Sequence, residues 1–224
     1  MVIPALNEQE SVGGVVTSAR AIPGVVAVIV TDNGSVDHTA ERAASAGAHV
    51  VPEPVRGYGR ACLTALARAE QFAPDTILFM DADAADDPDD ASSILQPIIT
   101  GRADMVVGSR IAQAEPGALL PQARFGNWLA TWMLDVFFHV KYSDLGPFRA
   151  IRWDVLQKLD MRDQDFGWTV EMQARAARMG FLGVEVPVNY RKRVGASKIS
   201  GTLAGSLRAG QKILMTLVKE RFFS

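Results

Sequence analysis

Two carboxylates, Asp81 and Asp83, come directly after the apolar run Ile77–Met80. In an extended chain, residues two apart point to the same side, so both carboxylates can reach one cation. Carboxylate oxygens are the ligands that Mg²⁺ and Mn²⁺ prefer. We therefore expect the pair to hold Mg²⁺ or Mn²⁺ together with a diphosphate. The alternative is that both acids belong to a solvated loop that precedes a helix.

The acidic residues that follow the pair favour this plainer interpretation. Asp87 is a typical helix N-cap, and Pro88 suits the first helical position. Asp89 and Asp90 would then lie in the first turn, where negative charge complements the helix dipole. These residues predict a helix start a few residues after the carboxylate pair.

Composition limits the class of protein. The chain of 224 residues is 48% hydrophobic and 21% charged, which is ordinary for a globular protein. The single cysteine, Cys62, excludes an internal disulfide framework and favours a reducing compartment. No leader pattern opens the chain, and no stretch approaches the roughly 20 apolar residues of a membrane-spanning helix. We expect a cytoplasmic protein, soluble or peripheral at the inner face of the membrane.

The net charge of −2 is unevenly distributed. From Val188 to Ser224 the chain carries eight lysines and arginines against Glu220 alone, so this tail is +7 and the rest is −9. A basic end of this kind meets phosphates or an anionic membrane surface, or is merely solvated. We do not expect nucleic acid, because no zinc, helix-turn-helix or RNA-binding signature accompanies the charge.

Strand-like and helix-like segments alternate along the first half of the chain. This pattern is typical of an α/β fold with a mostly parallel central sheet covered by helices on both faces. The expected strands are 2–3, 25–31, 49–51, 77–80 and 104–108, and the expected helices include 9–20, 39–46 and a segment ending at Ala69.

Ligands of an open parallel sheet bind outside the carboxyl ends of its strands. Five unusual loops belong at that edge, namely 4–8, 32–35, 56–59, 81–83 and 108–110. Asp32 is placed to accept hydrogen bonds from the N–H edge of a base, although it could equally form a turn that caps the next helix. The glycines around Tyr58 would let the backbone approach a phosphate or sugar closely, or would only make the loop flexible.

Five motifs occur in the order seen in a known family. They are Val2–Glu8, Thr31–Thr39, Met80–Asp83, Gly108–Arg110 and Gly146–Arg149. Together they resemble family 2 glycosyltransferases of the GT-A fold, and most of all the branch of dolichyl- and polyprenyl-phosphate hexose synthases. The match covers nearly the whole chain. The resemblance implies a Rossmann-like GT-A fold and inverting transfer of a hexose from a UDP- or GDP-sugar, with Mg²⁺ or Mn²⁺ as cofactor.

The resemblance also assigns site residues. Asp81 and Asp83 would hold the metal, and Asp83 is one of the expected catalytic residues. The expected nucleotide-sugar contacts are Pro4, Ala5, Leu6, Glu8, Asp32, Gly57, Asp81, Ala82 and Asp83. The chain departs from the family pattern at Asn33, where a second Asp is common, and at Gln9, where a second Glu is common. These departures keep Asp32 but leave the nucleotide open.

The second half should build the acceptor side. Residues 120–140 place aromatic side chains at helical spacing, which predicts either core packing or an interfacial, lipid-facing helix. Glu171 and Asp165 are the candidates for a general base, and the alternative for Glu171 is an i,i+4 pair with Arg175. The candidates for binding an acceptor phosphate are Arg110, Arg124, Arg149 and Lys198.

We expect one GT-A domain over residues 1–224. Residues 1–110 would bind the nucleotide sugar, and residues 111–224 would bind the acceptor and end in a basic amphipathic helix. The favoured acceptor is a polyprenyl phosphate at a membrane surface. A hydroxyl acceptor with a carboxylate base is the enzymatic alternative, and a catalytically silent nucleotide-binding or scaffold protein is the other. The oligomeric state stays open, a homo-oligomer included.

Overall fold

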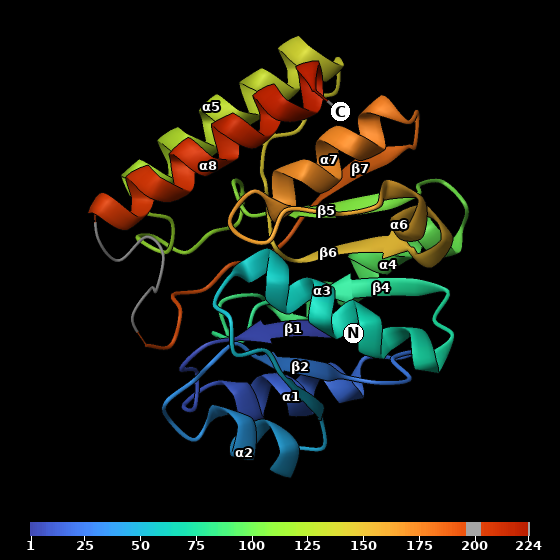
Figure 1. Ribbon diagram of the computed structural model, residues 1–224. Helices are drawn as coiled ribbons and strands as arrows, with labels where there is room; N and C mark the ends of the chain where they lie inside the picture. The colour runs from blue at the N-terminus through green and yellow to red at the C-terminus, as the bar shows by residue number, and fades with distance from the viewer. Residues whose placement is uncertain (196–202, 224) are drawn as a thin grey trace.

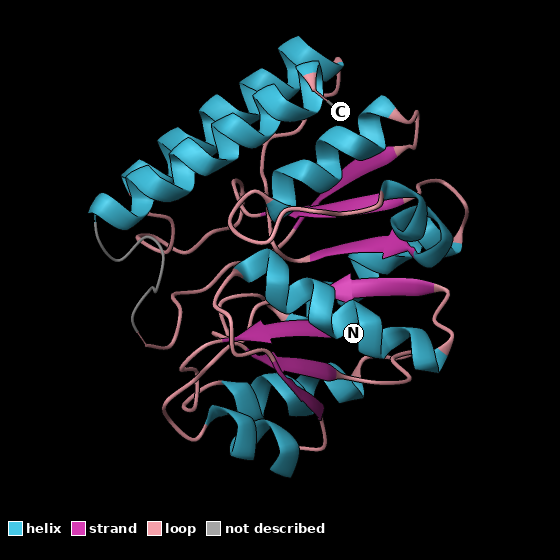
Figure 2. Ribbon diagram, in the orientation of Figure 1, coloured by secondary structure: helices cyan, strands magenta, loops and turns pink. Residues whose placement is uncertain are grey.

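The computed structural model describes residues 1–195 and 203–223. Seven strands form one sheet in the order β3-β2-β1-β4-β6-β5-β7 (Figures 1 and 2). They are β1 (Val2–Ala5), β2 (Ile29–Asp32), β3 (His49–Pro52), β4 (Thr76–Phe79), β5 (Met105–Ser109), β6 (Arg149–Arg152) and β7 (Gly183–Pro187). Only β6 is antiparallel to its neighbours β4 and β5. The predicted mostly parallel α/β sheet is therefore confirmed.

Helices connect the strands and cover the sheet. They are α1 (Val12–Ala21), α2 (Thr39–Ser45), α3 (Tyr58–Ala69), α4 (Ala91–Ile99), α5 (Pro121–Phe138), α6 (Trp153–Leu159), α7 (Trp168–Arg178) and α8 (Leu203–Phe222), with short 3-10 turns at Glu70–Phe72 and Pro88–Asp90. Asp87 caps the second of these turns, because its side chain accepts a hydrogen bond from the N–H of Asp89. The predicted helix start after the carboxylate pair is confirmed.

The strands divide their side chains between two apolar layers. Because neighbouring residues of a strand face opposite sides, Ile3 and Leu78 pack against α1, α2 and α4. Val2 and Ile77 pack against α3, α6 and α7 on the other face. Both faces of the sheet are therefore buried, which explains the continuously apolar strands.

A third cluster joins α5, α7 and α8 beside the sheet. Its buried members include Leu134 of α5, Ala174 of α7 and Leu217 of α8. In Figure 1, α5 and α8 lie side by side at the upper left, with α7 between them and the sheet. The layer beside the sheet is thus built on α7.

The chain order of the strands places a switch point next to β1. From β1 the chain moves outward through β2 and β3 and then returns to β4, which pairs with β1 on its other side. The loops after β1 and β4 consequently diverge at the carboxyl edge of the sheet, where open α/β sheets bind ligands.

Candidate functional site

A cavity of about 820 Å³ opens at this edge of the sheet. One side, here called the sheet-edge wall, consists of residues 4–8, 56–58 and 81–83. The opposite side, here called the helix wall, consists of residues 122, 123, 126 and 127 of α5 and 208–210 and 213 of α8. The volume falls within the range of about 300–1,000 Å³ that is usual for small-molecule sites.

Most of the predicted site residues meet in this cavity. The ones that line it are Pro4, Ala5, Leu6, Glu8, Gly57, Asp81, Ala82, Asp83, Arg110 and Asp165. They come from positions spread over 160 residues of sequence, and the carboxyl edge of the sheet is what gathers them.

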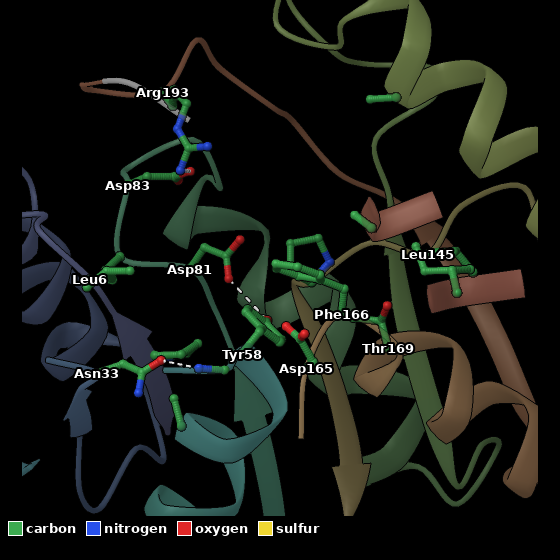
Figure 3. Close-up of a pocket in the computed structure, with 18 of the residues that line it drawn as sticks. Leu6, Asn33, Tyr58, Asp81, Asp83, Leu145, Asp165, Phe166, Thr169 and Arg193 are labelled. Carbon is green, nitrogen blue, oxygen red and sulfur yellow. Dashed lines mark hydrogen bonds and ion pairs between the residues drawn. The ribbon is translucent and has the colours of Figure 1, made fainter. Parts of the chain in front are cut away.

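Asp81 and Asp83 lie at the centre of the sheet-edge wall (Figure 3). Tyr58 donates its phenolic O–H to Asp81 Oδ1 at 3.1 Å, and Asp86 accepts the backbone N–H of Asp81 at 3.3 Å. Burial and the neighbouring charge of Asp83 raise the pKa of Asp81 to about 7. Burial and the charge of Asp81 likewise raise the pKa of the Tyr58 phenol well above its ordinary value.

Asp83 is 3% exposed and has one direct cationic partner among the described residues. Its Oδ2 lies 2.5 Å from Arg193 Nη2, and its Oδ1 accepts the backbone N–H of Ala85 at 3.0 Å. Arg193 also lies 3.6 Å from Glu8. A guanidinium thus offsets part of the negative charge that the sheet-edge wall concentrates.

The carboxylate pair fits a divalent cation shared with a substrate. The half-buried carboxylate of Asp81 and the buried carboxylates of Asp83 and Asp86 repel one another unless a cation lies nearby. Within residues 1–195 and 203–223, no group of three or more His, Cys, Asp or Glu side chains is arranged to hold a metal ion. This donor set suits Mg²⁺ or Mn²⁺, which commonly take one or two carboxylates and complete their shell with water and substrate phosphates.

Residues 189–194 run beside the loop that follows β4. The N–H of Val194 donates to the carbonyl of Asp83 at 2.9 Å, and the N–H of Arg191 donates to that of Ala85 at 2.8 Å. Arg191 also pairs with Asp87. These bonds bring Arg193 to the cavity. The sequence signal was the cluster of basic residues at 191–193, but nothing in it specified the partner.

Asp32 lies beside the cavity and is not part of its lining. Its Oδ1 accepts the N–H of Ser35 at 3.2 Å, so the turn-capping contact considered for this residue is present. The contact between Asp32 and a base stays a prediction.

Asn33 lines the cavity, and sequence reasoning missed its role. Its Nδ2 donates to the carbonyls of Glu53 at 3.0 Å and Val55 at 2.8 Å, and its Oδ1 accepts the N–H of Gly57 at 2.8 Å. The amide therefore braces the loop that carries Gly57. An aspartate at this position could not donate the two hydrogen bonds to residues 53 and 55, because a carboxylate has no N–H groups.

The glycines on either side of Tyr58 allow the backbone there to approach the backbone of residues 163–164 closely. A Cβ on Gly59 would lie 2.1 Å from the carbonyl oxygen of Asp163, and one on Gly57 would lie 2.2 Å from that of Gln164. In the space this leaves, the N–H groups of Gly59 and Arg60 donate to the carbonyls of residues 165 and 164. The start of α3 is thereby joined to the loop that precedes α7.

Arg110 lies between the main cavity and a second one of about 330 Å³. Its Nε and Nη2 donate to the two carboxylate oxygens of Asp144 at 2.7 and 2.8 Å. Its Cζ lies 5.1 Å from the centre of the Tyr190 ring. Burial would raise the pKa of Asp144, but the Arg110 guanidinium outweighs burial and holds that pKa below its ordinary value. The pair fixes Arg110 in place while leaving it in contact with both cavities.

The second cavity gathers positive charge. Arg110, Arg124, Lys192 and Arg193 line it. Among the described residues, Asp144, already paired with Arg110, is the one acidic residue in the lining. Arg124 was predicted at an acceptor phosphate, and it lies in this cavity and not in the main one. The two cavities share Arg110 and Arg193, so an anion here would border the carboxylate pair.

Arg149 does not reach either cavity, which argues against its predicted contact with an acceptor phosphate. It is 1% exposed, and its guanidinium donates to the carbonyls of Leu145, Gly146 and Thr169. Burial lowers its pKa to about 10. Arg149 instead ties the end of the 145–149 loop to α7. Lys198 lies outside the described residues.

Glu171 also lies away from the cavity, which argues against its predicted role as a general base. It is 2% exposed, pairs with Arg175 at 3.2 Å and accepts the N–H groups of Arg162 and Asp163. The alternative i,i+4 pair is thus the one found. Asp165 does line the cavity, and burial together with Asp163 raises its pKa.

Comparison with known proteins places this geometry in a family. Residues 1–159 match the profile described as Glycosyl transferase family 2. An uncharacterized glycosyltransferase of Mycobacterium bovis is 36% identical over 211 residues, which cover 93% of each chain. An undecaprenyl-phosphate mannosyltransferase of Micrococcus luteus is 29% identical and covers 91% of this chain and 88% of its own.

The fold is also found among solved structures. Glucosyl-3-phosphoglycerate synthase from Mycobacterium tuberculosis, in complex with Mn²⁺, uridine diphosphate and phosphoglyceric acid, superimposes with a TM-score of 0.80. It is 23% identical, and the match covers 100% of this chain and 78% of that one. This likeness supports the GT-A fold. With the family match over most of its length, the chain belongs to glycosyl transferase family 2.

Proposed function

We propose that this protein transfers a hexose from a nucleotide diphosphate sugar to a polyprenyl phosphate, with inversion at the anomeric carbon. The observation that carries the proposal is the second cavity, where Arg110, Arg124, Lys192 and Arg193 gather next to the carboxylate pair. Its charge suits a phosphate on the acceptor. The similarity to the undecaprenyl-phosphate mannosyltransferase of Micrococcus luteus supports the same assignment.

The sheet-edge wall is the proposed site of the nucleotide sugar. Leu6, Asn33 and Gly57 would lie along the nucleoside, and Asp81 and Asp83 would hold Mg²⁺ or Mn²⁺ at the diphosphate. When bound, this cation offsets the negative charge that builds on the departing nucleoside diphosphate. Arg193 contacts Asp83 and lines both cavities, so it can pair with a phosphate of either substrate.

The acceptor would attack without a strong general base. A phosphate monoester has a second pKa of about 6, so it is mostly dianionic at neutral pH. One of its oxygens forms the bond to the anomeric carbon while the bond from that carbon to the nucleoside diphosphate breaks. Arg110 and Arg124 would hold the attacking phosphate on the side opposite the leaving group. The burial of Glu171 in an ion pair agrees with a reaction that does not use it as a base.

A hydroxyl acceptor is the second candidate, and one observation favours it. Asp165 lies in the main cavity, and its pKa is raised, as is common for a general base. The solved relative that contains phosphoglyceric acid belongs to the same fold. Under this alternative, Asp165 would remove the proton of the attacking hydroxyl.

Two substitutions separate the candidates. Transfer of labelled hexose from UDP-glucose or GDP-mannose to a short polyprenyl phosphate would be measured in detergent with Mn²⁺ or Mg²⁺. For a phosphate acceptor, Arg124→Ala should lower kcat/KM about tenfold or more, since hydrogen bonds to charged groups contribute about 1.5–3 kcal/mol. Asp165→Asn should cost far less, and Arg102→Ala, which changes an exposed arginine remote from both cavities, should cost nothing.

The reverse order of effects would contradict the proposal. An inactive Asp165→Asn protein beside a fully active Arg124→Ala protein would favour the hydroxyl acceptor. Failure of the wild-type protein to transfer or hydrolyse any nucleotide sugar would favour a catalytically silent binding protein.

A further inference from the structure

The outer side of α5 exposes large apolar side chains. Phe125 is 62% exposed, Trp128 58%, Trp132 53% and Val136 48%. Their spacing of three or four residues places them in one row along the helix. The opposite side of α5 supplies Leu134 to the cluster that α5 shares with α7 and α8. The helix is therefore apolar on its buried side and on its exposed side alike.

Helix α8 has an unusual distribution of polarity. Met215 is 61% exposed and Phe222 63%, whereas Thr216 and Glu220 are 6% and 1% exposed. A helix on the surface of a water-soluble protein normally turns its charges outward and its apolar residues inward. These four residues of α8 do the reverse, whereas Leu217 is buried and Lys219 and Arg221 are exposed in the usual way.

Buried charges attach α8 to the rest of the protein. Glu220 pairs with Arg175 at 2.9 Å and with Arg178 at 3.4 Å, both on α7. Asp163, in the loop before α7, accepts from Lys212 at 3.0 Å and from Thr216 at 3.2 Å. These bonds hold the helix in one orientation, with Met215 and Phe222 facing outward. The ion pairs on the inner side of α8 therefore keep these two apolar side chains exposed.

The two helices carry more positive than negative charge. Helices α5 and α8 together carry five cations, Arg124, Arg208, Lys212, Lys219 and Arg221. Their acidic residues are Asp135 and Glu220, and Glu220 is already neutralised by α7. Lys212 is paired with Asp163, and Arg124 and Arg208 also line the two cavities. The cations that border the exposed apolar side chains are therefore Lys219 and Arg221, next to Phe222 at the end of α8.

We propose that the exposed faces of α5 and α8 form a docking surface for an anionic lipid bilayer. Trp and Phe suit the boundary between acyl chains and headgroups, and Lys and Arg next to them suit anionic headgroups. A two-fold contact with a second copy fits less well, because it would bring the same basic residues of both copies together. In the described part of the chain no helix is long and apolar enough to cross a membrane.

The same two helices form the helix wall of the cavity. Gly126 and Asn127 of α5, and Ala209 and Ile213 of α8, line it from the inner side. A bilayer on the outer side would lie one helix layer from the reacting groups. In this respect the inference rests on the proposed function, since a lipid phosphate must be presented beside the second cavity.

Vesicle sedimentation tests the docking surface directly. The probes are vesicles of phosphatidylcholine alone and of phosphatidylcholine with phosphatidylglycerol. We expect binding only to the anionic vesicles, weakened by salt. The double variant Trp128→Ala/Trp132→Ala should lower the partition coefficient about tenfold or more, because two large apolar side chains no longer enter the interface. Leu182→Ala, at a position 55% exposed beside β7, is the matched control and should bind like wild type.

Activity in detergent separates this inference from the proposed function. The double tryptophan variant should retain transfer to short polyprenyl phosphate in detergent, where no bilayer is needed. Wild-type protein that binds anionic vesicles but transfers no sugar to lipid phosphate would overturn the proposed function and leave the docking surface supported. Equal vesicle binding by wild type and the double variant would overturn the docking surface. Light scattering provides a second contradicting outcome. If the wild-type protein is a dimer that does not bind vesicles, and the double variant is a monomer, the surface binds a second copy and not a bilayer.

Discussion

The two walls of the main cavity are built by different means. The sheet-edge wall follows directly from strands β1 and β4, and backbone hydrogen bonds and buried glycines fix its loops. The helix wall stands one layer away from the sheet and is held by side-chain charges between α7 and α8. Substitutions in the first wall should therefore disturb chemistry and local packing. Substitutions in the second should disturb the attachment of a whole helix.

The largest loss of activity is expected from a substitution in the sheet-edge wall. Asp83→Ala should abolish transfer and prevent Mn²⁺-dependent binding of UDP or GDP, because it removes one of the two carboxylates proposed to hold the cation. Calorimetry of nucleotide with and without Mn²⁺ measures the binding, and circular dichroism checks that the fold is kept. Full activity of this variant, or of the wild type in EDTA, would show that the carboxylate pair holds no essential metal.

The next effect concerns the attachment of the helix wall. Glu220→Ala leaves Arg175 and Arg178 without their shared carboxylate partner. Breaking a buried pair typically costs about 3–5 kcal/mol, and we expect the lower end of this range because Arg175 keeps its pair with Glu171. Chemical denaturation should show this loss as a lower midpoint, or as an early transition that belongs to α8. Glu185→Ala is not a suitable control, because its carboxylate caps residues 143 and 144. Glu41→Ala, on the exposed side of α2, is expected to stay near wild type.

A smaller effect tests the backbone packing of the sheet-edge wall. Gly59→Ala places a Cβ 2.1 Å from the carbonyl of Asp163, so α3 must separate from the loop before α7, at a cost of about 1–3 kcal/mol. Gly14→Ala in α1 meets nothing within 4 Å and should stabilise the protein by about 0.5–1 kcal/mol. Urea denaturation of both variants measures the contrast. Equal stability of the two would mean that the close approach is not required.

The smallest effect concerns the orientation of Asp81. Tyr58→Phe removes the O–H donated to its carboxylate while keeping the ring, so Mn²⁺-dependent nucleotide affinity should fall by about 0.5–1.5 kcal/mol. Isothermal titration with UDP and Mn²⁺ measures this, with metal-free titration as the reference. A change that is the same with and without the metal would indicate a general packing effect instead of orientation of the carboxylate.

Local patterns in the sequence were sufficient for the α/β class, for the carboxyl-edge loops and for most residues of the sheet-edge wall. Apolar runs that alternate with helical segments lead to a parallel sheet, and such a sheet necessarily brings the ends of its strands to one edge. Pro4, Gly57 and Asp83 could therefore be placed together before their contacts were seen. Strand β7 and its pairing with β5 were not anticipated, because Gly183–Pro187 has little of the apolar character of the other strands.

Contacts between distant side chains could not be predicted from the sequence. The sequence left Glu171 open between a general base and an i,i+4 pair with Arg175, and the structure has the pair. Arg149 was expected at an acceptor phosphate, but packing brings backbone carbonyls to its guanidinium instead. Arg193 pairs with Asp83, which is 110 residues away in the sequence. Asn33 likewise donates to the carbonyl of Val55 because the fold, and not the local sequence, brings the two together. The aromatic row of α5 was compatible with core or with surface. Only the packing of α5 and α8 on α7 decided that Trp128 and Trp132 face outward, because burial is a property of neighbours and not of the helix itself.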